Sequence, residues 1–418
     1  MRYHEASEKG IQALRWQAIQ MEVGMTGRDE DVRKPVPFDA AQLDRLLDEA
    51  GIDLLIATSK HNVQYLLGGY RFFFFDTMDA IGVSRYLPVV VYRKGKSEQA
   101  AYIGCAMENF ERELGKFWPA TLALGDTGSA AAMREAVQHI KKLGDGIRRI
   151  GVEPAFLPAD AAAILHQELP NLDIVDAIVP LERLRARKTP EEIAHLREAS
   201  ERVVASMAAA FSQCRPGMTK LELSEILRRE EVARGLVFDY CLLTAGSSLN
   251  RAPSEQQLAA GDIISLDSGG NYHGYIGDLC RMGILGKPDT EQQGLLGFVE
   301  EVQQATRALV KPGARGGDII ALGDKMVAKS PHAAYTHYMA HGMGLVSHEA
   351  PRLMNLPRLS YTAYDAERPL EAGMVISIET TMAHPKRGFV KLEDTVLVTA
   401  SGHEALGDGA RGWNAAGA

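Results

Sequence analysis

The sequence lacks the features that would point to a membrane or a secreted protein. No apolar run approaches the roughly 20 residues that a membrane-spanning helix needs. The first residues, Met1 to Lys9, contain no apolar core of the kind that a signal peptide carries, so we expect none. The cysteines are few and form no CxxC pair; they are Cys105, Cys214, Cys241 and Cys280. Scattered thiols predict a reduced, cytoplasmic protein rather than a disulfide framework.

Positive charge is also scarce. Lysine and arginine number 46 against 54 aspartates and glutamates, which leaves a formal net charge of -8. This balance argues against a nucleic-acid partner and against an anionic membrane. The 418 residues, 46% of them hydrophobic and 24% charged, are enough for two domains with a large core.

Secondary-structure signals divide the chain into three parts. Residues 1–34 carry helix-spaced apolar side chains and predict a helical leader. Residues 35–184 alternate helix and strand signals and predict a small α/β domain. The segment Thr189–Glu192 has the Thr-Pro-x-Glu pattern of a helix N-terminus. That helix opens the third part, residues 185–418, in which two helices followed by strands are expected twice.

Four acidic residues of the third part lie in or beside apolar segments rich in β-branched residues. They are Asp267, Asp278, Glu379 and Glu393. A carboxylate inside a buried strand is costly unless it is paired or bound to a metal ion. Turn-prone residues separate the first two acids and the last two, so two hairpins are expected to bring all four together. The alternative is four unrelated acids on a solvated sheet edge.

The charge of this group favours metal ions. Four carboxylates carry a formal charge of about −4, which two divalent cations neutralise. The basic residues nearby in the sequence are few: Arg281, Lys386, Arg387 and Lys391. An oxygen-rich ligand set with one imidazole, from His341, suits manganese, cobalt, iron or zinc better than it suits a structural zinc site. We therefore expect two divalent ions, with manganese as the first choice.

The spacing of these residues resembles that of the M24 metallopeptidases. An aspartate is followed eleven residues later by a second, then by His-Gly-x-Gly-x-x-x-His-Glu at 341–349, Ile-Glu at 378–379 and Leu-Glu-Asp at 392–394. M24 is the pita-bread family, which includes Xaa-Pro aminopeptidase, prolidase, methionine aminopeptidase and creatinase. The resemblance implies an α/β (α+β) protein in which a smaller creatinase-type α/β domain precedes a C-terminal pita-bread domain.

The resemblance also implies a dinuclear metal site. In the family's arrangement Asp278 and Glu393 would bridge the two ions. Asp267 would complete one ion, and His341 with Glu379 would complete the other. A hydroxide that bridges the ions would attack the substrate, and Glu379 would carry its proton to the leaving nitrogen.

Three further residues are expected near the substrate. By resemblance, His348 and His337 line the substrate site and stabilise the tetrahedral intermediate, although a histidine on a strand is often an ordinary core residue. Lys391 stands where the prolyl peptidases usually carry arginine. It is expected to neutralise Glu379 or Glu393, and the alternative is a solvated lysine at a strand edge.

Two departures from the prolyl peptidases concern the substrate. Those enzymes usually carry a histidine in the loop before the first aspartate, where this chain has Asn250 or Arg251. An arginine there can bind a carboxylate through two hydrogen bonds, and a solvated loop arginine is the alternative. The proline that commonly follows the metal-binding glutamate is also missing, because Thr380 follows Glu379.

These observations leave three functions open. The first is a dinuclear metallohydrolase that cleaves Xaa-Pro dipeptides or removes the N-terminal residue of short Xaa-Pro peptides. The second is an M24 relative that acts on a small non-peptide metabolite, as a creatinase-like C–N hydrolase or a pita-bread lyase on a compatible solute or zwitterion. The third is a metal-free binding protein, against which the complete ligand set argues.

By the same resemblance the protein is expected to be a homodimer. The four consecutive phenylalanines Phe72–Phe75 would then form an aromatic wall over the partner subunit's site. Such a wall can hold a proline ring or a small cation. The alternative is a core or edge segment of the N-terminal domain.

Overall fold

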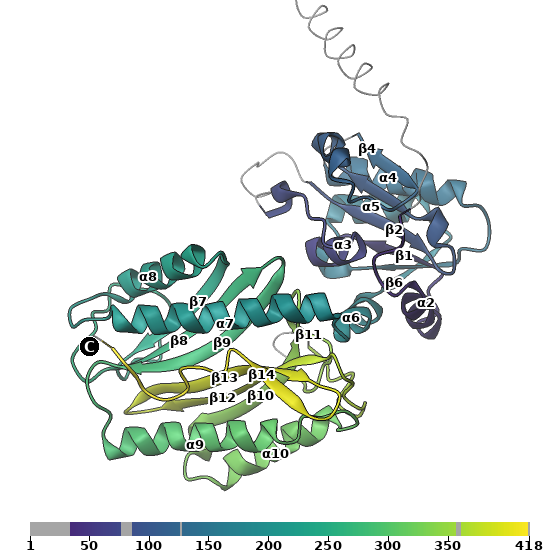
Figure 1. Ribbon diagram of the computed structural model, residues 1–418. Coiled ribbons are helices and arrows are strands. Elements are labelled where there is room, and N and C mark those ends of the chain that lie inside the picture. The colour runs from purple at the N-terminus through teal and green to yellow at the C-terminus, as the bar shows by residue number, and fades with distance from the viewer. Residues whose placement is uncertain (1–33, 77–85, 126–127, 357–360, 417–418) are drawn as a thin grey trace, which may run out of the picture.

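The computed structural model describes residues 34–76, 86–125, 128–356 and 361–416. These residues form two successive α/β units, each built on its own sheet (Figure 1). The predicted helical leader, residues 1–34, lies outside the described residues except for Lys34. Within the described ranges, no helix combines the length and apolar character that crossing a bilayer requires.

The first sheet has six strands in the order β4-β3-β2-β1-β5-β6. Its strands are β1 (Leu54–Ala57), β2 (Val89–Arg93), β3 (Ala101–Gly104), β4 (Thr121–Leu124), β5 (Arg149–Val152) and β6 (Asp173–Asp176). β2 pairs antiparallel with β1 and β3, and the other neighbours pair parallel. β2 begins directly after Pro88, because proline has no N–H to donate to a neighbouring strand.

Helices cover both faces of this sheet, as alternating side chains along buried strands require. They are α2 (Ala40–Glu49), α3 (Lys60–Leu66), α4 (Ser129–Lys142), α5 (Ala159–Glu168) and α6 (Ile178–Ala186). The 3-10 helices of this unit are η1 (Phe73–Asp76), η3 (Ser97–Gln99), η4 (Ala106–Leu114) and η5 (Pro154–Phe156). Leu55 packs with α2, α3 and α6. Its neighbour Leu54 packs with α4 and α5 on the opposite face.

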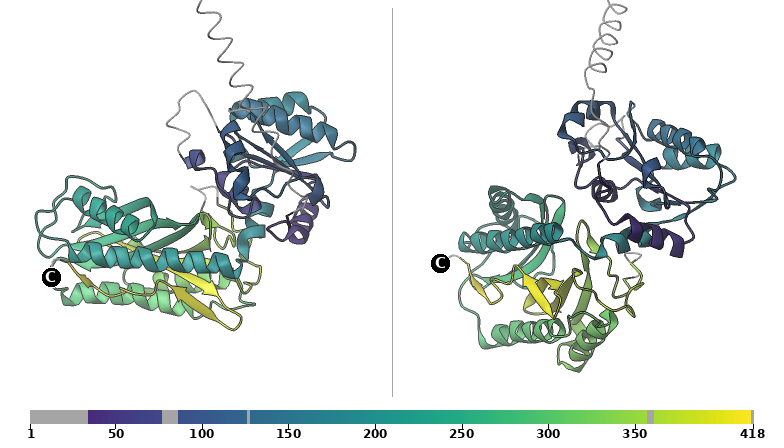
Figure 2. Two further views of the ribbon diagram at one scale, coloured as in Figure 1. Left: turned by 45° about the horizontal axis from the view of Figure 1, so that its top comes forward. Right: turned by 45° about the vertical axis from the view of Figure 1, so that its right-hand side comes forward.

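A capped helix leads into the second unit. The Thr189 hydroxyl accepts a hydrogen bond from the Glu192 N–H, and the Glu192 carboxylate accepts one from the Thr189 N–H. Pro190 takes the first helical position, so the predicted capping box is confirmed. The helix, α7 (Pro190–Ser212), runs along the strands of the second unit in both views of Figure 2.

The second sheet has nine strands, and its main path is β11-β10-β12-β13-β9-β8-β7. Its strands are β7 (Val237–Ala245), β8 (Ile263–Tyr272), β9 (Tyr275–Ile284), β10 (Thr336–Met343), β11 (Ser347–Glu349), β12 (Val375–His384), β13 (Gly388–Val398), β14 (His403–Leu406) and β15 (Asn414–Ala415). The remaining helices are α8 (Lys220–Ala233), α9 (Thr290–Arg307), α10 (Gly316–Lys329) and η6 (Ala333–Tyr335). Two helices followed by antiparallel strands occur twice, which confirms the predicted doubling.

Side-chain alternation turns the four acids away from the helices. Leu266 packs into the core beneath α7 and α8, so its neighbour Asp267 points to the opposite face of β8. In the other half Leu392 packs with α9, so Glu393 points away from that helix. The sheet thus presents a polar face whose position is fixed by two apolar cores.

Gly277, one residue before Asp278, lets α7 lie directly on β9. A Cβ at this position would stand 2.7 Å from the carbonyl carbon of Ala199 and 2.8 Å from the nitrogen of Ser200, both in α7. Any side chain there would force helix and strand apart. The backbone that carries Asp278 is therefore held by a contact between two main chains.

Candidate metal centre

Four carboxylates from four strands meet on the polar face of the second sheet. Asp267 lies on β8, Asp278 on β9, Glu379 on β12 and Glu393 on β13. Both predicted hairpins form, and in the second Glu379 stands directly opposite Glu393. The hairpins join where Glu393 pairs with Cys280. All four acidic side chains are buried, so the alternative of unrelated acids on a solvated edge is wrong.

His341, on β10, points an unpaired nitrogen at this group. Its Nδ1 lies 3.1 Å from the carbonyl oxygen of Gly342. Because a carbonyl can only accept, Nδ1 carries the proton and Nε2 carries the lone pair. Among the described residues this buried Nε2 has no hydrogen-bond partner, and it lies 3.8 Å from oxygens of both Glu379 and Glu393. A buried lone pair that faces carboxylates fits a metal cation.

Two overlapping sets of ligand atoms are compact enough for an ion. In the part of the chain that the structure describes, the sets whose atoms lie within 4.8 Å of one another are His341, His348 and Glu379, and Asp278, His341 and Glu393. Both sets contain His341. Of the five ligands that the resemblance implies, Asp267 belongs to neither set.

Hydroxyl groups fix two of the carboxylates. Tyr240 donates to Asp278 Oδ1 at 2.5 Å, and Ser347 donates to Asp278 Oδ2 at 2.7 Å. Ser377 donates to Glu393 Oε1 at 2.8 Å. Sequence reasoning missed all three. Strand alternation could have found Ser377, which lies two residues before a predicted ligand on β12, but no local signal links Tyr240 or Ser347 to Asp278.

Two basic side chains enter the group. The buried Lys391 Nζ lies 2.7 Å from Asp267 Oδ2, 2.6 Å from Glu379 Oε2 and 2.8 Å from Glu393 Oε2. Arg251 Nη2 also contacts Asp267 Oδ2. The reading of Lys391 as a solvated strand-edge residue is therefore wrong, and it pairs with both glutamates that it was expected to neutralise.

The pKa values show what these cations achieve. Burial raises the pKa of Asp278 to about 6, and the charge of Asp267 adds to the effect. Burial and then Asp278 raise the pKa of Glu393 well above its ordinary value. Burial also opposes ionisation of Glu379, but Lys391, His341 and His348 together outweigh it and lower the pKa to about 2. Glu379 is thus held ionised by the chain itself, whereas Glu393 needs a further cation.

Two more histidines lie beside His341. The ring of His348 stacks on that of His341, with centroids 3.8 Å apart and an angle of 11° between the planes. Burial, and then the neighbouring His341, lower the pKa of His348 to about 4. His337 lies four residues before His341 on β10, so alternation puts it on the same face, nearer the solvent.

A buried ion pair holds the strand that carries His348. The carboxylate of Glu349 accepts a hydrogen bond from Arg185 Nη2 at 2.8 Å and another from Lys188 Nζ at 3.1 Å. All three side chains are at most 3% exposed. Because Arg185 belongs to α6 and Glu349 ends β11, this pair ties the junction of the two units to the metal centre.

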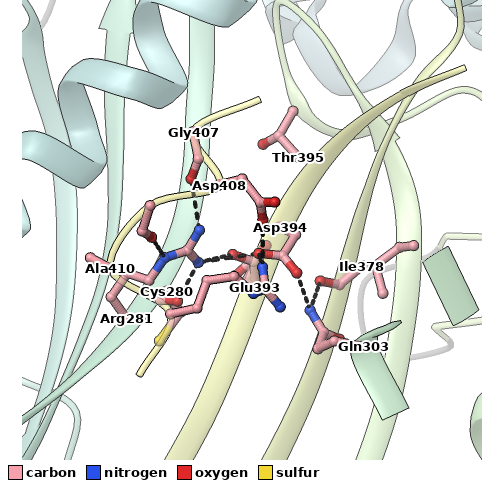
Figure 3. A network of polar contacts seen from close by, with 12 residues as sticks. Cys280, Arg281, Gln303, Ile378, Glu393, Asp394, Thr395, Gly407, Asp408 and Ala410 are labelled. Atoms are coloured by element: carbon pink, nitrogen blue, oxygen red, sulfur yellow. Dashed lines mark hydrogen bonds and ion pairs between the residues drawn. The ribbon is translucent and has the colours of Figure 1, made fainter. Parts of the chain in front are cut away.

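A second charged network lies behind the centre, on the opposite face of β13 (Figure 3). Asp394 Oδ1 contacts Arg411 at 2.5 Å and Arg281 at 3.2 Å, while its Oδ2 accepts a hydrogen bond from Gln303 at 2.9 Å. Arg281 also donates to the main-chain oxygen of Glu393 at 2.7 Å. Sequence reasoning counted Arg281 among the bases near the acids, which is wrong, because its side chain serves Asp394 instead.

Three other expected residues lie apart from the acids. Lys386 is exposed in the turn between β12 and β13. Arg387 pairs with two acids at the start of α9. Asn250 is exposed, and its side chain accepts a hydrogen bond from the Ala252 N–H at 3.0 Å. Of the two loop residues proposed to meet the substrate, the structure brings Arg251 to the centre and not Asn250.

The phenylalanine run is divided between core and surface. Phe72 is buried in the core of the first unit. Phe73 is 59% exposed, and Phe74 stacks on Tyr86 with centroids 5.4 Å apart. The side chain of Phe75 lies outside the described part. The core alternative holds for Phe72, and the aromatic wall over a partner subunit stays a prediction.

The comparisons with family models and with known proteins agree on one family. Residues 194–400 match Metallopeptidase family M24, and residues 40–187 match the Creatinase/Prolidase N-terminal domain. An Xaa-Pro dipeptidase of Pyrococcus horikoshii is 25% identical over 392 residues, which are 90% of this chain and 97% of the relative. An Xaa-Pro dipeptidase of Pyrococcus furiosus is 26% identical over 377 residues, which are 87% of this chain and 96% of the relative.

Solved structures share the fold. An Xaa-Pro dipeptidase from Bacillus anthracis has a TM-score of 0.74 at 24% identity and covers 90% of this chain and 98% of its own. A prolidase from Pyrococcus horikoshii has a TM-score of 0.72 at 22% identity and covers 88% of this chain and 97% of its own. The expected architecture, a creatinase-type domain followed by a pita-bread domain, is confirmed.

Proposed function

The chain belongs to metallopeptidase family M24 and is a metallohydrolase, and on this basis we propose that it cleaves the Xaa–Pro bond of dipeptides or of short peptides. The observation that carries the proposal is the buried lone pair of His341 Nε2, 3.8 Å from oxygens of Glu379 and Glu393. The substrate class rests on the relatives, which are Xaa-Pro dipeptidases at 25% and 26% identity.

A divalent cation is proposed to bind between Asp278, His341, Glu379 and Glu393, and manganese is the first ion to test. When bound, such an ion polarises the scissile carbonyl and makes a water molecule acidic enough to attack at neutral pH. The chain's own side chains then have to move the proton, bind the substrate and stabilise the charge that develops.

Glu379 is the proposed proton carrier. Its Oε2 is held by Lys391 at 2.6 Å, and its Oε1 faces His341. The pKa of Glu379, which Lys391 and the two neighbouring histidines lower against the effect of burial, keeps the carboxylate ionised before the reaction. It can therefore accept a proton from water and deliver it to the proline nitrogen as that group leaves.

Hydrogen bonding limits what His348 can do. The Ser347 hydroxyl donates to Asp278 at 2.7 Å, so its oxygen must accept from His348 Nδ1, which lies 3.0 Å away. The Nε2 of neutral His348 is then a bare lone pair. We propose that it accepts a hydrogen bond or a proton from the substrate, whereas stabilising a tetrahedral oxyanion requires a donor and falls to His337.

Arg251 is the proposed anchor for a substrate carboxylate. Its guanidinium lies against the Phe389 ring, 5.0 Å from the centroid, and reaches the buried Asp267 from the loop after β7. The free C-terminus of an Xaa-Pro dipeptide could be bound by the remaining N–H groups. The same feature favours the second candidate, a small carboxylate-bearing metabolite.

An activity panel separates the two candidates. Metal-stripped protein reconstituted with manganese(II) or cobalt(II) is assayed on Ala-Pro, Gly-Pro and a longer Xaa-Pro peptide, with Ala-Ala as the matched control. Turnover of the prolyl substrates that disappears with EDTA and returns with metal supports the prolyl peptidase. Absence of turnover on every prolyl substrate in metal-loaded protein rejects it in favour of the metabolite hydrolase or lyase.

The homodimer and the cytoplasmic setting stay predictions.

A further inference from the structure

The acidic group already contains a cation in the position where a second metal ion would be needed. Lys391 Nζ has three carboxylate oxygens within 2.8 Å, on Asp267, Glu379 and Glu393. An ammonium has three N–H donors, so these neighbours account for all of them. The side chain is 5% exposed, so the ammonium is held inside the group and largely away from solvent.

The charges of the described side chains balance with one divalent ion. Four carboxylates carry a formal charge of about −4, the buried Lys391 supplies about +1, and Arg251, whose side chain is 34% exposed, supplies about +1 from the solvent side. One divalent cation brings the sum to zero. A second ion would bring the sum to about +2, an excess that bound anions would have to neutralise inside the group.

The ligand geometry divides the group in the same way. Each compact set of ligand atoms contains His341, and neither includes Asp267. The Oδ2 of Asp267 instead contacts both Lys391 and Arg251. One end of the group, around His341, is therefore shaped for an ion, and the other end, around Asp267, is occupied by the chain's own basic side chains.

We propose that the centre binds a single divalent ion at the His341 end, and that the ammonium of Lys391 takes the place of the second ion at the Asp267 end. The proposal rests on the metal dependence proposed above and revises the expectation of two ions. It makes Asp267 a partner of Lys391 and Arg251 rather than a metal ligand. It also makes Lys391 the residue that sets the number of ions.

The test counts metal ions and does not depend on a substrate. Purified full-length protein is stripped, loaded with excess manganese(II) and desalted, and manganese per chain is measured by elemental analysis. Electron paramagnetic resonance distinguishes isolated from exchange-coupled manganese. The wild type is expected to hold one equivalent with the signal of an isolated ion. Lys391→Met is expected to hold two, with a coupled signal, because the variant leaves the Asp267 end without its ammonium.

Matched variants keep the result interpretable. Lys386→Met removes a lysine from the exposed turn of the same hairpin and is expected to leave one equivalent. Lys391→Gln removes the charge but keeps a polar side chain, and it is also expected to hold two, which keeps the inference testable if Lys391→Met folds poorly. Circular dichroism checks each variant.

Four outcomes decide the matter. Two coupled equivalents in the wild type would overturn the inference while leaving the proposed function intact. One equivalent in both the wild type and folded Lys391→Met would overturn the role of Lys391. One equivalent in the wild type with no prolyl turnover would support the inference and reject only the substrate. No bound manganese would reject both proposals.

Discussion

Glu393 and Asp394 are neighbours on β13, yet their side chains meet opposite kinds of surroundings. Asp394 turns towards Arg281, Arg307 and Arg411, all within 3.8 Å. Its pKa is lowered, because these arginines outweigh the effect of burial. Glu393 turns towards other carboxylates and shares one ammonium, and its pKa is raised well above the ordinary value by burial and by Asp278.

The contrast shows that burial alone does not identify a functional acid. Both side chains are at most 2% exposed. What differs is whether the chain supplies enough positive charge from within. The group around Asp394 is complete as it stands and holds the C-terminal segment through Arg411. The group around Glu393 is incomplete, and the nitrogen of His341, which has no hydrogen-bond partner in the described part of the chain, marks where a further cation belongs.

The largest effect is expected from removing a carboxylate from the metal centre around His341 and Glu393. Asp278→Ala should abolish metal binding and reduce kcat/KM on Ala-Pro by more than about 10³-fold, because it removes a carboxylate from the set around His341. Elemental analysis and steady-state kinetics check this. The exposed Asp48→Ala serves as the control. A variant that keeps the wild-type metal content would contradict the assignment of Asp278.

Removing the charge of Asp394, which is paired with arginines, should affect stability instead of metal binding. Asp394→Asn leaves the buried Arg281 without its carboxylate and should lower the free energy of unfolding by about 3–5 kcal/mol. Urea denaturation followed by circular dichroism measures the change. The folded Asp394→Asn variant should bind as much manganese as the wild type. A loss of metal without a loss of stability would show that Asp394 contributes to metal binding, which contradicts this prediction.

A smaller effect is expected at the edge of the metal centre. His348→Ala should lower kcat by about 10²–10³-fold, the range for removing a positioned proton acceptor, with metal content unchanged. The stacked neighbour His341→Ala should instead lose metal. If His348→Ala also loses metal, His348 is a ligand in the set that it forms with His341 and Glu379, and its proposed role as an acceptor is wrong.

A third buried acid, Glu231, sharpens the comparison, because within the described ranges no basic side chain pairs with it. Glu231 accepts a hydrogen bond from Ser268 at 2.7 Å, and its Oε2 lacks a partner among the described residues. Burial raises its pKa from 4.5 to about 7. The unfolded chain therefore releases the proton at lower pH than the folded chain does. Stability should fall as pH rises from about 4.5 to 7, by up to about 3 kcal/mol.

Glu231→Gln should remove that dependence. The difference in melting temperature between the variant and the wild type should grow in favour of the variant as pH rises from 5 to 8, measured by differential scanning calorimetry at fixed metal concentration. A constant difference across this range would show that the folded-state pKa of Glu231 is not raised.

The hairpins and the polar face could be predicted from sequence because they depend on local rules. Turn-forming residues between Asp267 and Asp278 predict one hairpin. The alternation of Leu266 and Asp267 predicts that the Asp267 side chain lies on the face of the strand opposite the core. Alternation also predicts that Arg281, three residues after Asp278, lies on the face of the sheet opposite the metal centre, where it pairs with Asp394. The contact of Lys391 with Asp267 could not be predicted, because it depends on β13 lying beside β9, a pairing between residues more than 100 positions apart.

The direct contact between Gly277 and α7 has a consequence for engineering this protein. Near Asp278 main-chain atoms determine the separation of helix and strand, so smaller side chains in the surrounding core cannot narrow it, and a side chain at Gly277 would only widen it. Attempts to admit a bulkier substrate therefore have to alter groups that reach the centre from outside the sheet, such as Arg251 in the loop after β7, whereas the strand that carries Asp278 behaves as a fixed template.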